Sequence, residues 1–290
     1  MSGPGLFVKT MIELTNISKR FNNFKAVDDI SFTVDRGEFF GLLGPNGAGK
    51  TTIISMLSTV LLPSEGTIKI DGNVLDRKAS STKRKISVIT QEYSVRQDMT
   101  MDEVMEYQGR LYFMSRKDIK RKTDELFEFA NLTEFRHRTV RKLSGGMKRK
   151  LMVCRALLTD PDILLLDEPT AGMDAISRRQ MWNLLRKLNN NKMTIILTTH
   201  YMEEAQVLCD RVALINVGKL EKIDSPSNLI DELGEYAIDE NVNDGIKSVF
   251  FHDKQEAIDY LKNTANKAEL RATTLEDVFL ECYGRKIEVD

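Results

Sequence analysis

The stretch Gly44-Pro45-Asn46-Gly47-Ala48-Gly49-Lys50-Thr51, followed by Thr52, decides the fold of this chain. It fits the phosphate-binding loop pattern G-x-x-x-x-G-K-[ST] at every constrained position. The apolar run before it predicts a short buried strand over 38–43, and residues 51–57 predict the opening of a helix. The glycines let backbone N–H groups surround phosphate oxygens, Lys50 adds a charge for the β- and γ-phosphates, and the Thr51 hydroxyl can ligate Mg²⁺. The sequence therefore predicts a nucleoside triphosphate site.

Composition sets wide limits around this site. The chain has 290 residues, enough for one large domain or one domain with a small appendage. Its 42 basic and 43 acidic residues give a formal net charge of -1, so we expect no nucleic-acid partner. We interpret the basic clusters at 83–85, 116–122 and 148–150 as solvated helix faces. No apolar run approaches the roughly 18–20 residues that span a bilayer, so we expect the chain to be soluble by itself.

A second landmark is the apolar run 163–166, which ends in Asp167 and Glu168. Such a run predicts a fully buried, parallel strand whose carboxyl end projects two acidic side chains. In open α/β sheets this edge is where ligands bind. Asp167 is placed to hold Mg²⁺, and Glu168 to orient a water for attack on the γ-phosphate.

The run Leu143-Ser144-Gly145-Gly146-Met147 lies upstream of the acidic strand and resembles the LSGGQ signature of the ATP-binding cassette (ABC) superfamily. Ser144 is typical of a helix N-cap, and the glycines leave N–H groups exposed. Met147 in place of glutamine is the one departure. The resemblance implies that ATP and Mg²⁺ are the ligands. It also implies a second cassette, either this chain or a paralogue, because ATP is bound between the phosphate loop of one chain and the signature of the other.

Three further landmarks carry the resemblance. Gln91 follows a predicted strand and is similar to the Q-loop glutamine, which reaches Mg²⁺ and the attacking water. His200 ends the predicted strand 194–199 and resembles the H-loop histidine, which contacts the γ-phosphate. Asp174, in Ala171-Gly172-Met173-Asp174, resembles the D-loop aspartate that crosses the dimer interface.

An aromatic residue near the start of the cassette completes the expected site. Phe21 resembles the platform on which adenine stacks, Phe24 is its rival, and Val27 is in a position to line the same site. The resemblance then assigns four groups of residues: nucleotide-binding Phe21, Val27, Gly44, Pro45, Asn46, Gly47, Ala48, Gly49, Lys50, Thr51 and Thr52; metal-binding Thr51, Gln91 and Asp167; catalytic Lys50, Gln91, Glu168 and His200; and, acting in trans, Ser144, Gly145, Gly146, Met147 and Asp174.

The landmarks predict an α/β fold: a P-loop NTPase core with a mostly parallel sheet, an antiparallel β subdomain, an inserted helical subdomain and a small C-terminal α+β extension. We expect an N-terminal extension over 1–10, the ATPase domain over 11–225 and an accessory region over 226–290. The helical insertion should cover about 92–158, with helices over 101–114, 116–131 and after Ser144. In the ABC superfamily this insertion rotates when ATP binds, and its groove receives a helix from a membrane partner. Residues 92–94 and 107–112 are the candidates for that groove.

The tail is less regular. We predict two strands over 212–223, strands at 236–238 and 247–251, and a helix over 254–265. Thr274 and Asp277 fit a helix-capping pattern that opens a final helix. The segment T-L-E-D-V-F-L at 274–280 resembles the C-terminus of ATP-binding subunits of ABC-2-type exporters, which move drugs, lipids, polysaccharides or ions outward.

The resemblance implies the ATP-hydrolysing subunit of an ABC transporter, peripheral at the cytoplasmic face of the membrane. A separate transmembrane permease subunit would contact the cargo, and this chain would not. The ATPase subunit of an importer is an open alternative, because it shares every catalytic motif. A non-transport ABC ATPase with a soluble partner is another. A GTPase is disfavoured, because the string at 191–194, which is similar to N-K-x-D, lacks the aspartate.

Overall fold

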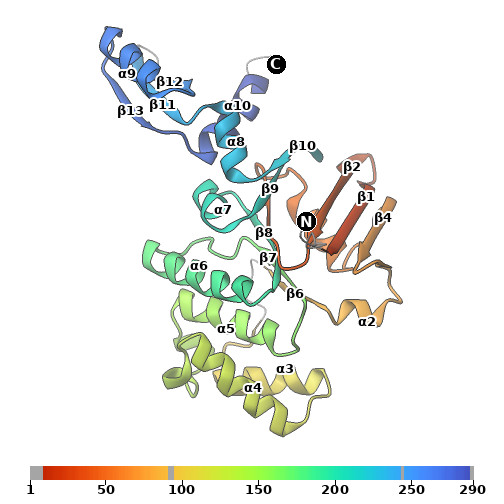
Figure 1. The fold of residues 1–290 in the computed structure, drawn as a ribbon. Helices are drawn as coiled ribbons and strands as arrows, with labels where there is room; N and C mark the ends of the chain where they lie inside the picture. The colour runs from red at the N-terminus through yellow and green to blue at the C-terminus, as the bar shows by residue number, and fades with distance from the viewer. Residues whose placement is uncertain (1–8, 91–94, 243–244, 288–290) are drawn as a thin grey trace, which may run out of the picture.

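The centre of the molecule is a mostly parallel sheet, and the predicted phosphate loop follows the carboxyl end of one of its inner strands. The computed structural model describes residues 9–90, 95–242 and 245–287, and its six-stranded sheet has the order β10-β9-β3-β8-β7-β6 (Figure 1). Every residue of β3, β7 and β8 is buried, because these apolar strands are covered on both faces. The bounds are β3 (Phe39–Leu43), β6 (Ile86–Ile89), β7 (Ile163–Asp167), β8 (Thr194–Thr199), β9 (Arg211–Asn216) and β10 (Lys219–Asp224). All pairs are parallel except β9–β10, which forms a hairpin.

The two faces of this sheet belong to different hydrophobic cores. Phe40 and Leu42 of β3 face a core shared with helix α1 and the antiparallel sheet β2-β1-β4-β5, whereas Phe39 and Leu43 face a helical layer. The predicted antiparallel subdomain is therefore confirmed. Its strands are β1 (Thr10–Phe21), β2 (Phe24–Asp35), β4 (Glu65–Ile70) and β5 (Asn73–Val74). Helix α1 (Lys50–Leu57) follows the phosphate loop and packs in the core between the two sheets.

The helical layer contains the predicted insertion. Its helices begin at capping residues: Thr100 forms a capping box before α3, and Ser115 caps α4. The prediction that the first helix reaches 114 is wrong, because Phe113 has a φ of +59° and the helix ends at Leu111. The helices of this layer are α3 (Met101–Leu111), α4 (Arg116–Phe129), α5 (Gly145–Leu157), α6 (Ala175–Asn190) and α7 (Met202–Leu208), with the short elements η1 (Thr133–Phe135) and η2 (Val140–Lys142). The short helix α2 (Ser80–Lys83) lies on the side of β4 instead (Figure 1).

The C-terminal region is a small α+β module that projects beyond α7 (Figure 1). It holds a three-stranded antiparallel sheet, β12-β11-β13, which is more structure than the sequence predicted, since α8 and β13 were missed. The elements are α8 (Pro226–Leu233), β11 (Tyr236–Val242), β12 (Gly245–Phe251), α9 (Lys254–Asn263), β13 (Ala268–Ala272) and α10 (Leu275–Ile287).

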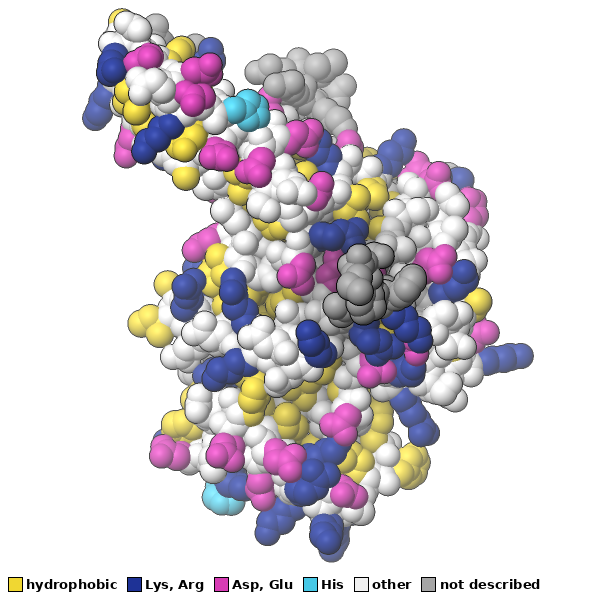
Figure 2. Space-filling view, in the orientation of Figure 1, with side chains coloured by type: hydrophobic (Ala, Val, Ile, Leu, Met, Phe, Trp, Pro, Cys, Tyr) yellow, Lys and Arg dark blue, Asp and Glu magenta, His cyan; other side chains and the backbone are white. Residues whose placement is uncertain are grey.

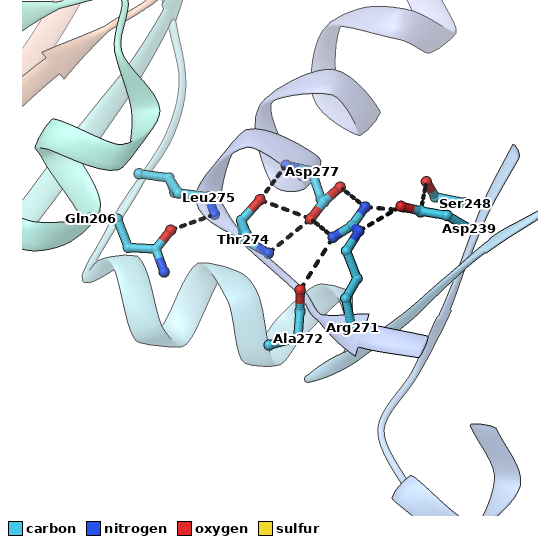
Figure 3. Close-up of polar contacts among 8 residues, drawn as sticks. All are labelled: Gln206, Asp239, Ser248, Arg271, Ala272, Thr274, Leu275 and Asp277. Carbon is cyan, nitrogen blue, oxygen red and sulfur yellow. Dashed lines mark hydrogen bonds and ion pairs between the residues drawn. The ribbon is translucent and has the colours of Figure 1, made fainter. Parts of the chain in front are cut away.

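A charged network joins this sheet to α10 (Figure 3). Arg271 on β13 donates to Asp239 on β11 at 2.7 Å and to both carboxylate oxygens of Asp277 on α10 at 2.7 and 2.8 Å. Asp277 also accepts from the backbone N–H of Thr274 at 2.8 Å, which confirms the predicted cap. One guanidinium thus fixes the sheet against the first turn of the last helix.

Two further bonds join α10 to the ATPase core. The N–H of Leu275 donates to Oε1 of Gln206 on α7 at 3.0 Å (Figure 3). The buried hydroxyl of Tyr283 donates to the carbonyl of Ile215 on β9 at 3.1 Å. The C-terminal module is therefore anchored to the helix and strand that follow His200.

We expect Arg271→Met to lower the free energy of unfolding by about 1–3 kcal/mol at pH 7, because it leaves two carboxylates without their partner. Hydrogen bonds from Arg271 lower the pKa of Asp239. Burial raises the pKa of Asp277, but bonds from Arg271 and Thr274 outweigh it, and the net shift is downward. Carboxyls with lowered pKa values stabilise the fold above their unfolded value, about 3.9, and lose this contribution as the pH falls.

The measurement is urea unfolding of the wild type and the variant between pH 7 and pH 3. The difference between the two proteins should shrink as both carboxyls become protonated. Lys262→Met is the matched control, because it removes an exposed ion pair with Asp259 in the same module. Equal stability of Arg271→Met and Lys262→Met at pH 7 would show that the network contributes nothing.

Candidate nucleotide-binding and hydrolysis site

A cleft of about 640 Å³ opens where the parallel strands end. Its position agrees with the rule that open α/β sheets bind ligands at the carboxyl edge of their strands. The cleft brings together the phosphate loop, the acidic strand and the end of β8, as the sequence predicted. Its lining residues are Phe21, Phe24, Ala26, Asn46, Gly47, Gly49, Lys50, Thr51, Thr52, Glu168, Ala171 and His200.

The glycines of the phosphate loop are required by close backbone contacts. A Cβ on Gly44 would lie 2.1 Å from the carbonyl oxygen of Ile215, and one on Gly49 would lie 2.5 Å from that of Ala26. Gly49 also has a φ of +105°, which L side chains rarely adopt. Gly47, by contrast, faces open space. The loop is thus packed against the core on one side and open to a ligand on the other.

The amino end of α1 faces this opening. Gly49 supplies no side-chain cap, and the first-turn N–H groups of a helix have no partner within the helix. Lys50 folds across the loop and donates from Nζ to the carbonyls of Gly44 and Pro45 at 2.7 and 2.9 Å. Burial lowers the pKa of Lys50, while the charges of Glu168 and Asp167 partly oppose that shift. A bound polyphosphate would satisfy both the free N–H groups and the buried charge, so the site fits a nucleoside triphosphate.

The predicted metal ligands meet beside the loop. Thr51 Oγ1 lies 3.4 Å from Asp167 Oδ1, and Thr198 Oγ1 donates to the same carboxylate oxygen at 2.5 Å. Hydroxyl and carboxylate oxygens are the ligands that Mg²⁺ prefers beside substrate phosphates. These residues therefore fit a magnesium ion. Gln91, the third predicted ligand, lies outside the described residues.

Glu168 and His200 are brought together although they are 32 residues apart. His200 Nδ1 lies 3.1 Å from Glu168 Oε1, and both side chains line the cleft. Glu168 has a φ of +48°, a left-handed conformation that few non-glycine residues adopt. This turn at the end of β7 directs the carboxylate toward the histidine. The pair is positioned to act on a water beside a terminal phosphate.

Arg149 is a supporting residue that the sequence interpretation missed. It was assigned to a solvated basic face, but it is 3% exposed and donates to the carbonyls of Thr90, Glu168 and Pro169 at 2.6–2.7 Å. It therefore fixes the loop that carries Glu168 to the segment before residue 91. Its partners are distant backbone carbonyls, so no local pattern signals its role.

The adenine side of the cleft has two exposed aromatic rings. Phe21 and Phe24 both line the cleft and are 42% and 61% exposed. Either ring is therefore available to stack on adenine. Val27 is fully buried in the core, and it is Ala26 that lines the cleft at this point.

The signature forms a separate surface. Ser144 caps α5 by accepting from the N–H of Met147 at 3.2 Å, as predicted. A Cβ on Gly146 would lie 3.0 Å from Oγ of Ser177, whose N–H donates to Asp174 at 2.8 Å. The signature and Asp174 thus share one surface, and neither lines the nucleotide cleft of its own chain. The signature surface is therefore separate from the nucleotide cleft of the same chain.

Together, the fold and the cleft define a P-loop nucleoside triphosphatase. The family model described as "ABC transporter" matches residues 27–171. The chain belongs to this family, and it is accordingly an ABC ATPase whose nucleotide is ATP.

Curated relatives and solved structures agree. The Nod factor export ATP-binding protein I of Ralstonia nicotianae is 35% identical over 98% of this chain and 97% of its own length. The linearmycin resistance ATP-binding protein LnrL of Bacillus subtilis is 37% identical over 83% of this chain and 77% of its own. A bacterial ABC transporter cassette solved as a dimer is 27% identical with a TM-score of 0.66, covering 74% of this chain and 98% of that one.

These findings confirm the predicted fold and the resemblance to exporter ATPases. Within the described residues, no helix is both long and apolar enough to cross a bilayer.

Proposed function

We propose that this chain is the ATP-hydrolysing subunit of an ABC exporter, in which a cassette dimer drives a separate transmembrane permease at the cytoplasmic face of the membrane. The observation that carries the proposal is the Glu168–His200 pair, 3.1 Å apart, in the same cleft as the phosphate loop. The printed names of the relatives, which refer to Nod factor export and linearmycin resistance, favour an exporter over an importer.

In the proposed mechanism two cassettes close head to tail over two ATP molecules. Lys50, Gln91, Glu168 and His200 of one chain would bound each γ-phosphate, and residues 144–147 with Asp174 of the second cassette would cover it. Glu168 accepts the proton of the attacking water, and His200 orients the Glu168 carboxylate and reaches the phosphate. Thr51, Asp167 and Gln91 would hold Mg²⁺, which would supply positive charge to neutralise the charge that develops on the phosphate. Rate enhancement then comes from positioning and electrostatics.

The proposed permease contact lies on the helical subdomain. Tyr107, Leu111, Tyr112 and Phe113 are all exposed, and Phe113 is exposed by 93%. A cleft of about 420 Å³ next to them is lined in part by Leu111, Tyr112 and Phe113. Figure 2 shows hydrophobic side chains at the surface among charges of both signs. Exposed apolar side chains that line one cleft are candidates for a protein contact. The other predicted contact residues, 92–94, lie outside the described residues.

The test is a pull-down of the tagged chain from native membranes in mild detergent. We expect a polytopic membrane protein to be recovered with the wild type, and its recovery to fall about tenfold or more with Phe113→Glu, because a charge would be buried in the contact. Val60→Glu is the control, since Val60 is similarly exposed on another surface. Recovery of a soluble partner alone would support a non-transport ATPase, and an importer permease would overturn the exporter assignment.

A further inference from the structure

Two neighbouring glutamates on α7 have opposite environments. Glu203 is exposed, whereas Glu204 is completely buried, four residues after His200. Burial raises the pKa of the Glu204 carboxyl by more than its hydrogen bonds lower it. A buried carboxyl is costly unless the surrounding structure uses it. The groups that Glu204 binds therefore indicate its role.

One oxygen of Glu204 joins three segments of the chain. Its Oε1 accepts from the hydroxyl of Thr170 at 2.9 Å and from the indole N–H of Trp182 at 3.0 Å. Thr170 belongs to the loop that carries Glu168 and is 1% exposed, and Trp182 belongs to α6. Oε2 is left without a hydrogen-bond partner among the described residues. The bond from Oε1 to Thr170 therefore connects α7 to the loop after β7.

The same loop is held from its other side by Arg149, which donates to the carbonyls of Glu168 and Pro169. The loop is consequently fixed between α5 and α7. Because α7 begins two residues after His200, a bond from Glu204 to Thr170 sets the position of the helix following the histidine relative to the loop that carries Glu168. The left-handed φ of Glu168 depends on such fixed surroundings.

We infer that Glu204 is a positioning residue for ATP hydrolysis: through Thr170 it holds Glu168 and His200 in register. The inference rests on the proposed hydrolytic function. Glu204 does not line the nucleotide cleft, and its hydrogen bonds go to Thr170 and Trp182, so it acts on the chemical step and leaves nucleotide binding unchanged. Displacement of a reacting group by a fraction of an ångström to one ångström is enough to slow an enzyme by one to two orders of magnitude.

The experiment measures steady-state ATPase rates and the affinity for a fluorescent ATP analogue. Thr170→Val, which removes the hydroxyl and keeps the shape, and Glu204→Ala should each lower kcat by about tenfold or more, with KM and analogue affinity within about twofold of wild type. Glu204→Gln should recover most of kcat, because its amide oxygen still accepts from Thr170. Trp182→Phe removes the other donor to the same oxygen, so it should lower the Tm and leave kcat nearly unchanged. Glu203→Ala should change neither.

Two results would overturn the inference while the wild type remains an active ATPase. One is a wild-type kcat in a folded Thr170→Val protein. The other is an equal loss of kcat in Glu204→Ala and Trp182→Phe, which would reduce Glu204 to general support of the fold. A wild-type chain without ATPase activity, alone or with its partners, would instead overturn the proposed function.

Discussion

Glu168→Gln is expected to bind Mg·ATP, to hydrolyse it at least about 100-fold more slowly, and to accumulate as an ATP-dependent dimer. The amide keeps the size of the carboxylate and its contact with His200, 3.1 Å away, but cannot accept the proton of the attacking water. In the proposed mechanism the closed dimer reopens only after hydrolysis, so the variant should be trapped closed. Size-exclusion chromatography with and without ATP, next to a phosphate-release assay, measures both effects.

The matched control is Glu203→Gln, since Glu203 is an exposed carboxylate on the helix that follows His200. It should behave as the wild type in both assays. A Glu168→Gln protein with full hydrolysis would show that another group takes the proton. Loss of ATP binding in this variant would show that Glu168 holds the nucleotide rather than the water.

Ser144→Arg is expected to retain ATP binding and to lose nearly all hydrolysis. Ser144 lies outside the cleft of its own chain, so a bulky cation there leaves the phosphate loop intact. In the closed dimer the same side chain would enter the site of the second cassette and disable that site. Binding of a fluorescent ATP analogue to the monomer and the ATPase rate separate the two effects.

The substitution also removes a helix cap, which costs about 1 kcal/mol. Ser225→Arg controls for this loss, because Ser225 caps α8 through the same kind of bond. The control should lose stability and retain hydrolysis. A Ser144→Arg monomer that no longer binds the analogue would contradict a role in trans.

Most of the catalytic core could be predicted from the sequence, because its signals are local. The strands β3 and β7 are continuous apolar runs, and the caps at Thr100 and Ser144 mark helix starts by their own side chains. That Glu168 and His200 belong to one site was implied by the resemblance to the ABC superfamily, and their meeting agrees with the rule that ligands bind at the carboxyl ends of parallel strands.

The missed features depend on long-range contacts. Arg149 sits among basic residues, and only the fold brings three carbonyls to its guanidinium. The strand β13 is polar at Glu269 and Arg271, and it is stabilised by Asp239, 32 residues earlier than Arg271. The helix predicted to reach 114 stops early because Phe113 turns left-handed, which its residue type does not suggest.

The central claim is that each hydrolysis site is shared by two chains, and mixing two inactive variants tests it most directly. Lys50→Ala removes the phosphate-loop charge and keeps the signature, whereas Ser144→Arg does the reverse. In a mixed dimer, one site would combine the intact Lys50 of one chain with the intact Ser144 of the other. An equal mixture should therefore recover about a quarter of wild-type hydrolysis, since about half the dimers are mixed and each has one of two sites intact. A mixture as inactive as its components, although the two differently tagged chains copurify in ATP, would contradict the account.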